Sequence, residues 1–170
     1  LGLKRRGFGA GNYNGFGGKL EKRETMRECA ARETHEECGL AFAPARLRRR
    51  GLLHFHMLSD GMTLADGLVA SRIHVDVFSC ELAEASGAVV ETEEMAPRWF
   101  DVDAIPYAEM WHDDTFWLPR FLAGERFEGW FDYSAGGEKK NLVLAHEVVP
   151  LPSSTPLKPP RADRNFISPP

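Results

Sequence analysis

The residues from 18 to 40 constrain the fold most, because charged side chains recur there at fixed spacing between two glycines. These charged positions are Glu24, Arg32, Glu33, Glu36 and Glu37. Thr25 and Glu28 have the spacing of a capping box, in which each side chain bonds the backbone of the other residue, so a helix is predicted to begin at Met26. Gly39 predicts its end, since glycine readily takes the left-handed conformation that follows many helices.

The acidic side chains of this helix converge on one side. At about 100° per residue, Glu33, Glu36 and Glu37 fall within about a third of the circumference. Met26 shares this sector, so we expect the sector to face protein or a cleft, while Arg32 is expected on the opposite side. Like charges three and four residues apart repel, and a divalent cation would remove that repulsion. Oxygen ligands of this kind suit Mg²⁺ or Mn²⁺. The alternative is the solvated face of an ordinary acidic helix.

The spacing of this stretch resembles the Nudix box of the Nudix hydrolases. The matching positions are Gly18, Glu24, Arg32, Glu33, Glu36, Glu37, Gly39 and Leu40. Thr34 departs from the pattern, since the family prefers a bulky aliphatic residue there, and we expect a modest loss of core packing. The resemblance implies an α/β/α sandwich around a mixed sheet and hydrolysis of a nucleoside diphosphate linked to another group.

The resemblance also implies roles for single residues. Glu33, Glu36 and Glu37 would hold Mg²⁺, or Mn²⁺, and one of them would act as general base. The carbonyl of Gly17 and the carboxylate of Glu94 would complete the metal site. Arg32 and Glu24 would orient the metal ligands. The metals would neutralise the phosphates and activate a water molecule.

Residues outside the box resemble the Nudix hydrolases that act on oxidised purine nucleoside triphosphates, such as 8-oxo-dGTP and 2-hydroxy-dATP. The similar runs are residues 4–11, 14–19 and 110–119. Trp111 offers a flat face on which a purine can stack. Asp113 and Asp114 offer acceptors to a guanine edge, and since two adjacent buried carboxylates do not readily both ionise, one could stay protonated and donate. The simpler interpretations are a helix N-terminus for the two aspartates and a core position for Trp111.

The predicted pocket draws on the whole domain. Phe8, Phe55 and Trp117 would form its walls, Asn14 would read a base edge, and Lys4 would lie near the sugar or base. The full set of predicted substrate-binding residues is Lys4, Phe8, Asn14, Phe16, Gly17, Gly18, Lys19, Phe55, Trp111, Asp113, Asp114 and Trp117.

The remaining pattern indicates one Nudix domain over residues 1–149, with a first strand that is reduced to its last residues, 1–3. Alternating apolar residues predict strands at 52–58 and 73–80, and a hairpin of strands 127–133 and 141–149. Residues 62–72 are expected to be an extended hairpin loop, and Asp114 is expected to cap a second helix. Residues 150–170 are rich in proline and are predicted to be a disordered tail.

The net charge and the cysteines indicate which partners and which cellular compartment are expected for the protein. A net charge of -4 gives no electrostatic footprint for duplex nucleic acid. The three cysteines form no CxxC pair, which suits reduced thiols in the cytoplasm. No apolar run is long enough to cross a bilayer. We therefore expect a cytoplasmic monomer without membrane or nucleic-acid polymer partners, with nuclear or mitochondrial nucleotide pools as further locations.

Two other functions remain open from the sequence. One is a Nudix hydrolase of another nucleotide, such as an ordinary dNTP or a cap-like compound, because the box determines the chemistry and not the substrate. The other is a truncated, non-catalytic Nudix-like domain that binds a nucleotide or a partner, an alternative suggested by the shortened first strand.

Overall fold

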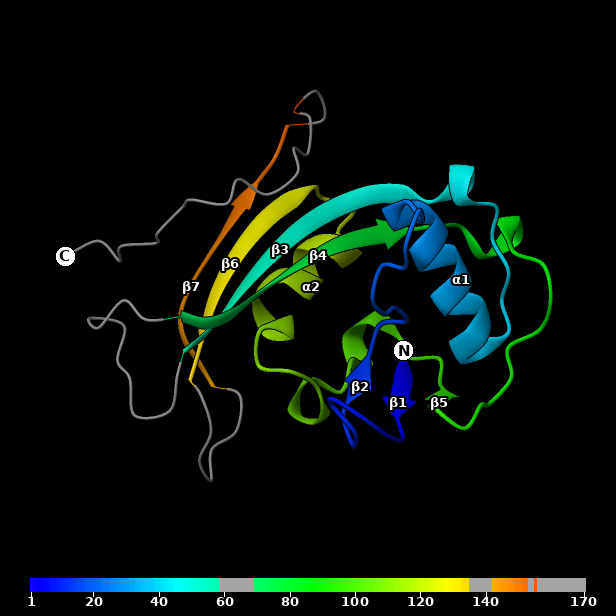
Figure 1. The fold of residues 1–170 in the computed structure, drawn as a ribbon, viewed down its shortest axis with the longest axis horizontal. Coiled ribbons are helices and arrows are strands. Elements are labelled where there is room, and N and C mark those ends of the chain that lie inside the picture. Colours follow the sequence, from blue (N-terminus) through cyan, green and yellow to red (C-terminus); the bar gives the residue numbers. More distant parts are fainter. Residues whose placement is uncertain (59–68, 135–141, 153–154, 156–170) are drawn as a thin grey trace. The chain divides into compact units, whose positions relative to one another are not determined.

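The computed structural model describes residues 1–58, 69–134, 142–152 and 155. It is a mixed α/β structure with two α-helices (Figure 1). The chain divides into two compact units, Leu1–Arg49 with Phe78–Thr115, and Arg50–Val77 with Phe116–Pro170. Each unit is described separately below.

The first unit contains a small antiparallel sheet in the order β2-β1-β5. Its strands are β1 (Gly2–Lys4), β2 (Tyr13–Asn14) and β5 (Met95–Pro97). Leu3 pairs with Tyr13 on one side and with Ala96 on the other, so β1 is the central strand. The residues that the sequence predicted as the end of a first strand thus form a strand that is paired on both sides.

Helix α1 (Met26–Cys38) begins and ends where its caps predicted. Thr25 accepts a hydrogen bond from the Glu28 N–H, and the Glu28 carboxylate accepts one from the Thr25 N–H, which confirms the capping box. Gly39 closes the helix with a φ of 81°. In the sector that was expected to face protein or a cleft, Glu37 is buried, while Met26 in the first turn is 41% exposed. Short 3₁₀ turns follow elsewhere, at Pro44–Arg46, Leu82–Glu84, Val102–Ala104 and Tyr107–Glu109.

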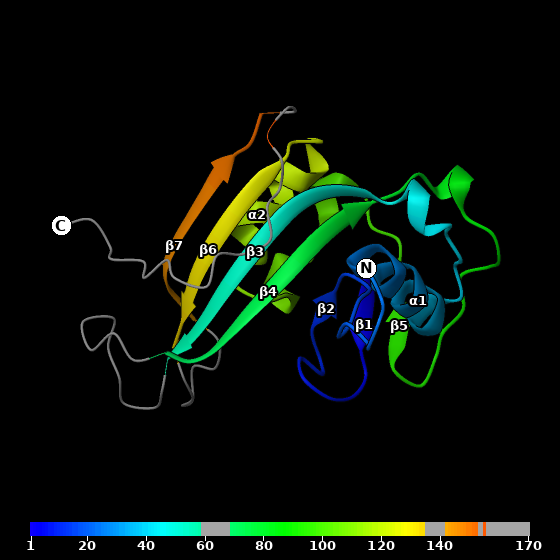
Figure 2. The ribbon, with the colours of Figure 1, turned by 45° about the horizontal axis from the view of Figure 1, so that its top comes forward.

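A four-stranded mixed sheet has the order β4-β3-β6-β7 (Figure 2). Its strands are β3 (Arg48–Leu58), β4 (Val69–Ser79), β6 (Phe127–Tyr133) and β7 (Val143–Pro150). Strand β3 pairs in parallel with β6, and β6 pairs antiparallel with β7, so the predicted mixed sheet is confirmed. Strands β3 and β4 begin four residues before the predicted starts, at Arg48 and Val69, because backbone pairing does not require the apolar alternation from which the strands were predicted.

Helix α2 (Asp114–Leu122) supplies aromatic side chains to the core of the second unit. The buried centre consists of Leu53, Phe127, Phe131 and Tyr133, and Phe116, Trp117 and Phe121 of α2 pack against it. A Cβ at Gly51 would overlap the Phe127 ring, so glycine allows this close approach. The helix begins at Asp114 itself, one residue earlier than the predicted cap implies, and contains Pro119.

The expected hairpin loop and tail fall largely outside the described residues. Residues 69–72 of the predicted loop belong to β4, while residues 62–68 are not described. Pro150, where the tail was predicted to begin, is the last residue of β7, and most of residues 151–170 are not described. Among the helices that the structure describes, none has the length and apolar character to span a membrane.

Candidate active site

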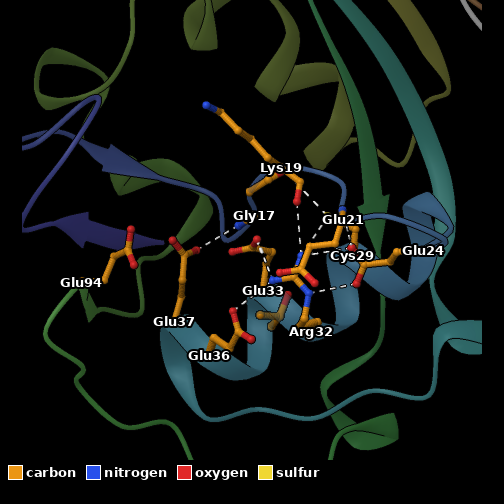
Figure 3. A network of polar contacts seen from close by, with 12 residues as sticks. Gly17, Lys19, Glu21, Glu24, Cys29, Arg32, Glu33, Glu36, Glu37 and Glu94 are labelled. Atoms are coloured by element: carbon orange, nitrogen blue, oxygen red, sulfur yellow. Dashed lines mark hydrogen bonds and ion pairs between the residues drawn. The ribbon is translucent and has the colours of Figure 1, made fainter.

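Arg32 joins three of the predicted catalytic carboxylates (Figure 3). It contacts Glu24 with two nitrogens, Nε to Oε1 at 2.9 Å and Nη2 to Oε2 at 3.1 Å. Its Nη1 contacts Glu33 Oε1 at 2.9 Å and Glu36 Oε2 at 3.0 Å. The guanidinium lowers the pKa of the Glu24 carboxyl to about 2. The expectation that Arg32 points away from the acidic sector was therefore wrong, because its long side chain reaches around the helix to neighbouring positions.

Glu37 and Glu94 are joined by a different cation, Lys4 of β1. The Lys4 Nζ lies 2.9 Å from Glu37 Oε1 and 2.7 Å from Glu94 Oε1. The other Glu37 oxygen accepts a hydrogen bond from the Gly17 N–H at 2.9 Å. The Glu37 side chain is only 3% exposed, and this burial raises the pKa of its carboxyl despite these contacts. Lys4 was predicted near the sugar or base, and here its ammonium is held by two predicted metal ligands.

The glycine-rich loop before α1 fits closely against the carboxylates. A Cβ at Gly18 would overlap the Glu33 carboxylate, so a side chain at this position would displace that predicted metal ligand. The Lys19 carbonyl accepts a hydrogen bond from Arg32 at 3.3 Å, while the Lys19 side chain points away from the carboxylates (Figure 3). The loop therefore contacts Glu33, Glu37 and Arg32 mainly through its backbone.

Thr92 is a structural residue of this site that the sequence did not reveal. Its hydroxyl accepts from the Met95 N–H at 3.0 Å and from the Glu94 N–H at 3.3 Å. It also donates to the Glu37 carbonyl at 3.3 Å. Thr92 thus ties the loop that carries Glu94 to the end of α1, and only its position two residues before Glu94 could have indicated such a turn.

The acidic group has the chemistry of a divalent-metal site. The carboxylate oxygens of Glu33, Glu36, Glu37 and Glu94 are the hard donors that Mg²⁺, Mn²⁺ and Ca²⁺ prefer, and Glu33 and Glu37 lie beside the loop backbone (Figure 3). In the part of the chain that the structure describes, no three acidic, histidine or cysteine side chains are grouped so as to hold a metal. The carboxylate oxygens contact cations of the protein instead: Arg32 contacts Glu33 and Glu36, and Lys4 contacts Glu37 and Glu94. The type of donor atom therefore fits a divalent metal, and a bound metal would take the place of the Arg32 or Lys4 contacts at these oxygens.

A second group of predicted site residues lies in the same unit. The rings of Phe8 and Trp111 stack with centroids 4.9 Å apart and an interplanar angle of 25°. Gly9 has a φ of 81°, and a Cβ there would lie 3.0 Å from Trp111 and 3.3 Å from the Asn14 amide nitrogen. Phe8 is 71% exposed, so this aromatic stack lies at the surface of the unit. An aromatic surface with an amide beside it could stack and hydrogen-bond a base.

Asp113 and Asp114 follow Trp111 and are buried, at 5% and 7% exposed. The Trp111 N–H donates to Asp114 Oδ2 at 3.0 Å. Burial, and then the charge of Asp113, raises the pKa of the Asp114 carboxyl to about 8. A carboxyl whose pKa is raised in this way keeps its proton to a higher pH than an ordinary aspartate, and in the protonated form it can donate a hydrogen bond.

Three other predicted substrate residues pack within their own units. Phe16 lies against Gly2 of β1, where a Cβ would meet its ring at 2.8 Å. Phe55 and Trp117 belong to the second unit. Phe55 stacks on Phe131 with centroids 5.5 Å apart, and Trp117 lies 5.7 Å from Phe127. The predicted role of Phe55 and Trp117 as pocket walls, and that of Phe16 in substrate binding, stay predictions.

Comparisons with known proteins agree with the box. The NUDIX domain family matches residues 1–121. The chain is 39% identical over 148 residues to the oxidized purine nucleoside triphosphate hydrolase of Danio rerio, and 38% identical to that of Mus musculus. Each alignment covers 87% of this chain and 84% of the relative. The solved structure of the mutator MutT protein from Bacillus halodurans has a similar fold, with a TM-score of 0.65, 21% identity and coverage of 78% of this chain and 79% of that one.

The box residues predicted from the sequence lie on α1 and on the segments directly before and after it, and the family matches most of the chain. The fold is shared with a solved MutT protein. The chain therefore belongs to the Nudix family.

Proposed function

We propose that this protein hydrolyses oxidised purine nucleoside triphosphates, such as 8-oxo-dGTP and 2-hydroxy-dATP, to the monophosphate and pyrophosphate. The observation that carries the proposal is the presence of two groups in one compact unit. One is the glutamate group of α1, and the other is the Trp111, Asp113 and Asp114 group with its raised Asp114 pKa. The names of the two relatives, from which this chain differs at about three positions in five, support the same substrate class.

Nudix hydrolases generally need divalent metal ions. For this chain we propose Mg²⁺, with Mn²⁺ as a substitute, held by Glu33, Glu36, Glu37, Glu94 and the Gly17 carbonyl. When bound, such a metal neutralises phosphate charge and lowers the pKa of water. Arg32 holds the glutamates in place through Glu24, and one of the three helix glutamates accepts the proton of the attacking water.

We propose that Trp111, Asp113 and Asp114, together with Asn14, select the base of the nucleotide. The face of Trp111 would stack on the purine, and Asn14 would offer one acceptor and two donors to its edge. The protonated Asp114 would donate to a base acceptor, while Asp113 would accept from a base N–H. Since a carboxyl pair that shares one proton can exchange donor and acceptor roles, it can pair with oxidised guanine and with oxidised adenine.

We further propose that the protein acts as a monomer in the cytoplasm, with nuclear or mitochondrial nucleotide pools as further locations. The three cysteines, which form no CxxC pair, support a reducing compartment, and the net charge of -4 gives no electrostatic footprint for a nucleic-acid partner.

The test is a product analysis. The purified protein is incubated with 8-oxo-dGTP and Mg²⁺, and the products are followed by ³¹P NMR. We expect the monophosphate and pyrophosphate in equal amounts, and no reaction with excess EDTA. Release of inorganic phosphate instead would contradict the proposed bond cleavage, and product formation in EDTA would contradict the metal requirement. A Glu36→Gln variant controls for a contaminating phosphatase, because its activity should fall sharply.

A further inference from the structure

The ammonium of Lys4 lies where the predicted metal ligands Glu37 and Glu94 meet. It contacts one oxygen of each carboxylate, at 2.9 Å and 2.7 Å. The Lys4 side chain is 13% exposed and the Glu37 side chain 3% exposed, so this contact is largely closed to water. The contact joins Lys4 of β1 to Glu37 of α1, 33 residues away in sequence, and to Glu94 in the loop before β5, 90 residues away.

Glu37 has few oxygens to offer. Its Oε2 is fixed by the Gly17 N–H at 2.9 Å, and its Oε1 is the atom that Lys4 contacts. Glu94 also contacts Lys4 through Oε1. Glu37 and Glu94 would hold a divalent cation through carboxylate oxygens, and the Lys4 ammonium contacts one oxygen of each. The divalent cation would also bring two positive charges close to the ammonium in a partly dry site, where repulsion between like charges is strong.

Lys4 differs in this respect from Arg32. Arg32 contacts Glu24 with two nitrogens, so it has an anchor apart from Glu33 and Glu36. Among the described residues, the polar contacts of the Lys4 ammonium are those with the carboxylates of Glu37 and Glu94. A metal at these carboxylates would thus leave Lys4 without its present counter-charges.

We propose that Lys4 is an exchangeable counter-cation of the metal site. Without metal, its ammonium neutralises Glu37 and Glu94 and keeps the site assembled; a divalent cation then displaces it. Metal loading and movement of Lys4 are therefore one event, and Lys4 weakens metal binding to the nucleotide-free protein. This proposal rests on the metal site of the proposed function, and it gives Lys4 a positioning role that does not require contact with the base.

The first test measures Mn²⁺ binding to the nucleotide-free protein by EPR of the free ion. Lys4→Gln should tighten Mn²⁺ binding by roughly tenfold, since both the competitor and a nearby charge are removed. Arg6→Gln is the matched control: Arg6 also lies near Glu94, with Nη2 3.6 Å from Oε2, but its side chain is 63% exposed. Arg6→Gln removes one positive charge but leaves the Lys4 ammonium between Glu37 and Glu94, so we expect the affinity for Mn²⁺ to change by at most about twofold to threefold. Equal gains in the two variants, or weaker binding in Lys4→Gln, would overturn the proposal.

A second measurement follows Lys4 directly in the unaltered sequence. Lysines are reductively methylated with ¹³C-formaldehyde, and the Lys4 signal is assigned by its loss in Lys4→Arg. Its chemical shift should move on addition of Mg²⁺, with the midpoint of Mg²⁺ binding, while the Lys19 signal serves as a reference. A Lys4 signal that stays in place while metal binds would overturn this proposal and leave the proposed function intact. No metal binding to wild type or Lys4→Gln would overturn both.

Discussion

Replacement of Glu37 by glutamine tests the structure of the site without any substrate. Glu37 accepts from the Lys4 ammonium through one oxygen and from the Gly17 N–H through the other, each at 2.9 Å. A glutamine has one acceptor oxygen and one NH₂ group. In either orientation of the amide, the NH₂ group would face a donor. One buried donor must therefore lose its partner.

The magnitude follows from these contacts. Loss of a hydrogen bond to a charged group costs about 1.5–3 kcal/mol, and a buried donor without a partner costs about 1–3 kcal/mol. Two effects reduce the sum. Lys4 keeps its contact with Glu94 at 2.7 Å. Burial raises the pKa of Glu37, so a neutral side chain escapes part of the cost of burying a charge. Burial lowers the pKa of Lys4, but its contacts with Glu94 and Glu37 together raise it by more, so the pKa of Lys4 is raised overall. We expect a net destabilisation of about 2 kcal/mol.

The assay is urea unfolding in EDTA, followed by tryptophan fluorescence. Glu94→Gln is the matched control, because Glu94 contacts the same ammonium but its side chain is 39% exposed, and we expect it to cost less than about 1 kcal/mol. The midpoint should shift while the denaturant slope stays unchanged. A Glu37→Gln variant as stable as wild type, or a Glu94→Gln variant equally destabilised, would refute this description of the Lys4 contacts.

Three further predictions concern other parts of the chain. Gly18→Ala should lower kcat/KM by about tenfold to a hundredfold and weaken Mn²⁺ binding, because its Cβ overlaps the Glu33 carboxylate; Gly15→Ala, with open space around it, should match wild type in both assays. The pKa of Asp114 is raised from 3.8 to about 8, so its contribution to stability is fully present below pH 4 and declines as pH rises to 8; Asp114→Asn should flatten the dependence of Tm on pH in that window, and an unchanged slope would contradict the raised pKa. Phe131→Ala, at a position that is 0% exposed, should cost about 3–5 kcal/mol in urea unfolding, and a loss below about 1 kcal/mol would contradict its place at the centre of the core.

Local signals in the sequence were sufficient for α1 and for the identity of the acidic group. Thr25, Glu28 and Gly39 act on backbone groups a few residues away, so the spacing of these residues predicted the helix ends. The alternating strands were also found, but not their full lengths, because pairing of backbone groups does not require an apolar residue. Strand β2 was missed, since Tyr13 and Asn14 lie in a glycine-rich run and are ordered by pairing with β1.

Contacts between distant residues could not be predicted in the same way. Lys4 and Glu94 are 90 residues apart, and nothing in the spacing of the box connects them. The prediction for α1 considered only the direction in which each side chain leaves the helix, at about 100° per residue. It therefore placed Arg32 away from Glu33 and Glu36, although the long guanidinium side chain reaches both. The same prediction placed Met26 with Glu37, but Met26 in the first turn is 41% exposed while Glu37 is buried.

The most direct test of the proposed function compares kcat/KM for 8-oxo-dGTP and dGTP in Mg²⁺, read as pyrophosphate release. If Trp111, Asp113 and Asp114 read the oxidised base, 8-oxo-dGTP should be preferred by at least about tenfold. The Asp113→Asn and Asp114→Asn variants should lose most of that preference while they still bind Mn²⁺ as wild type does. Equal kcat/KM values for the two nucleotides in the wild type, or a preference that survives both substitutions, would contradict the account.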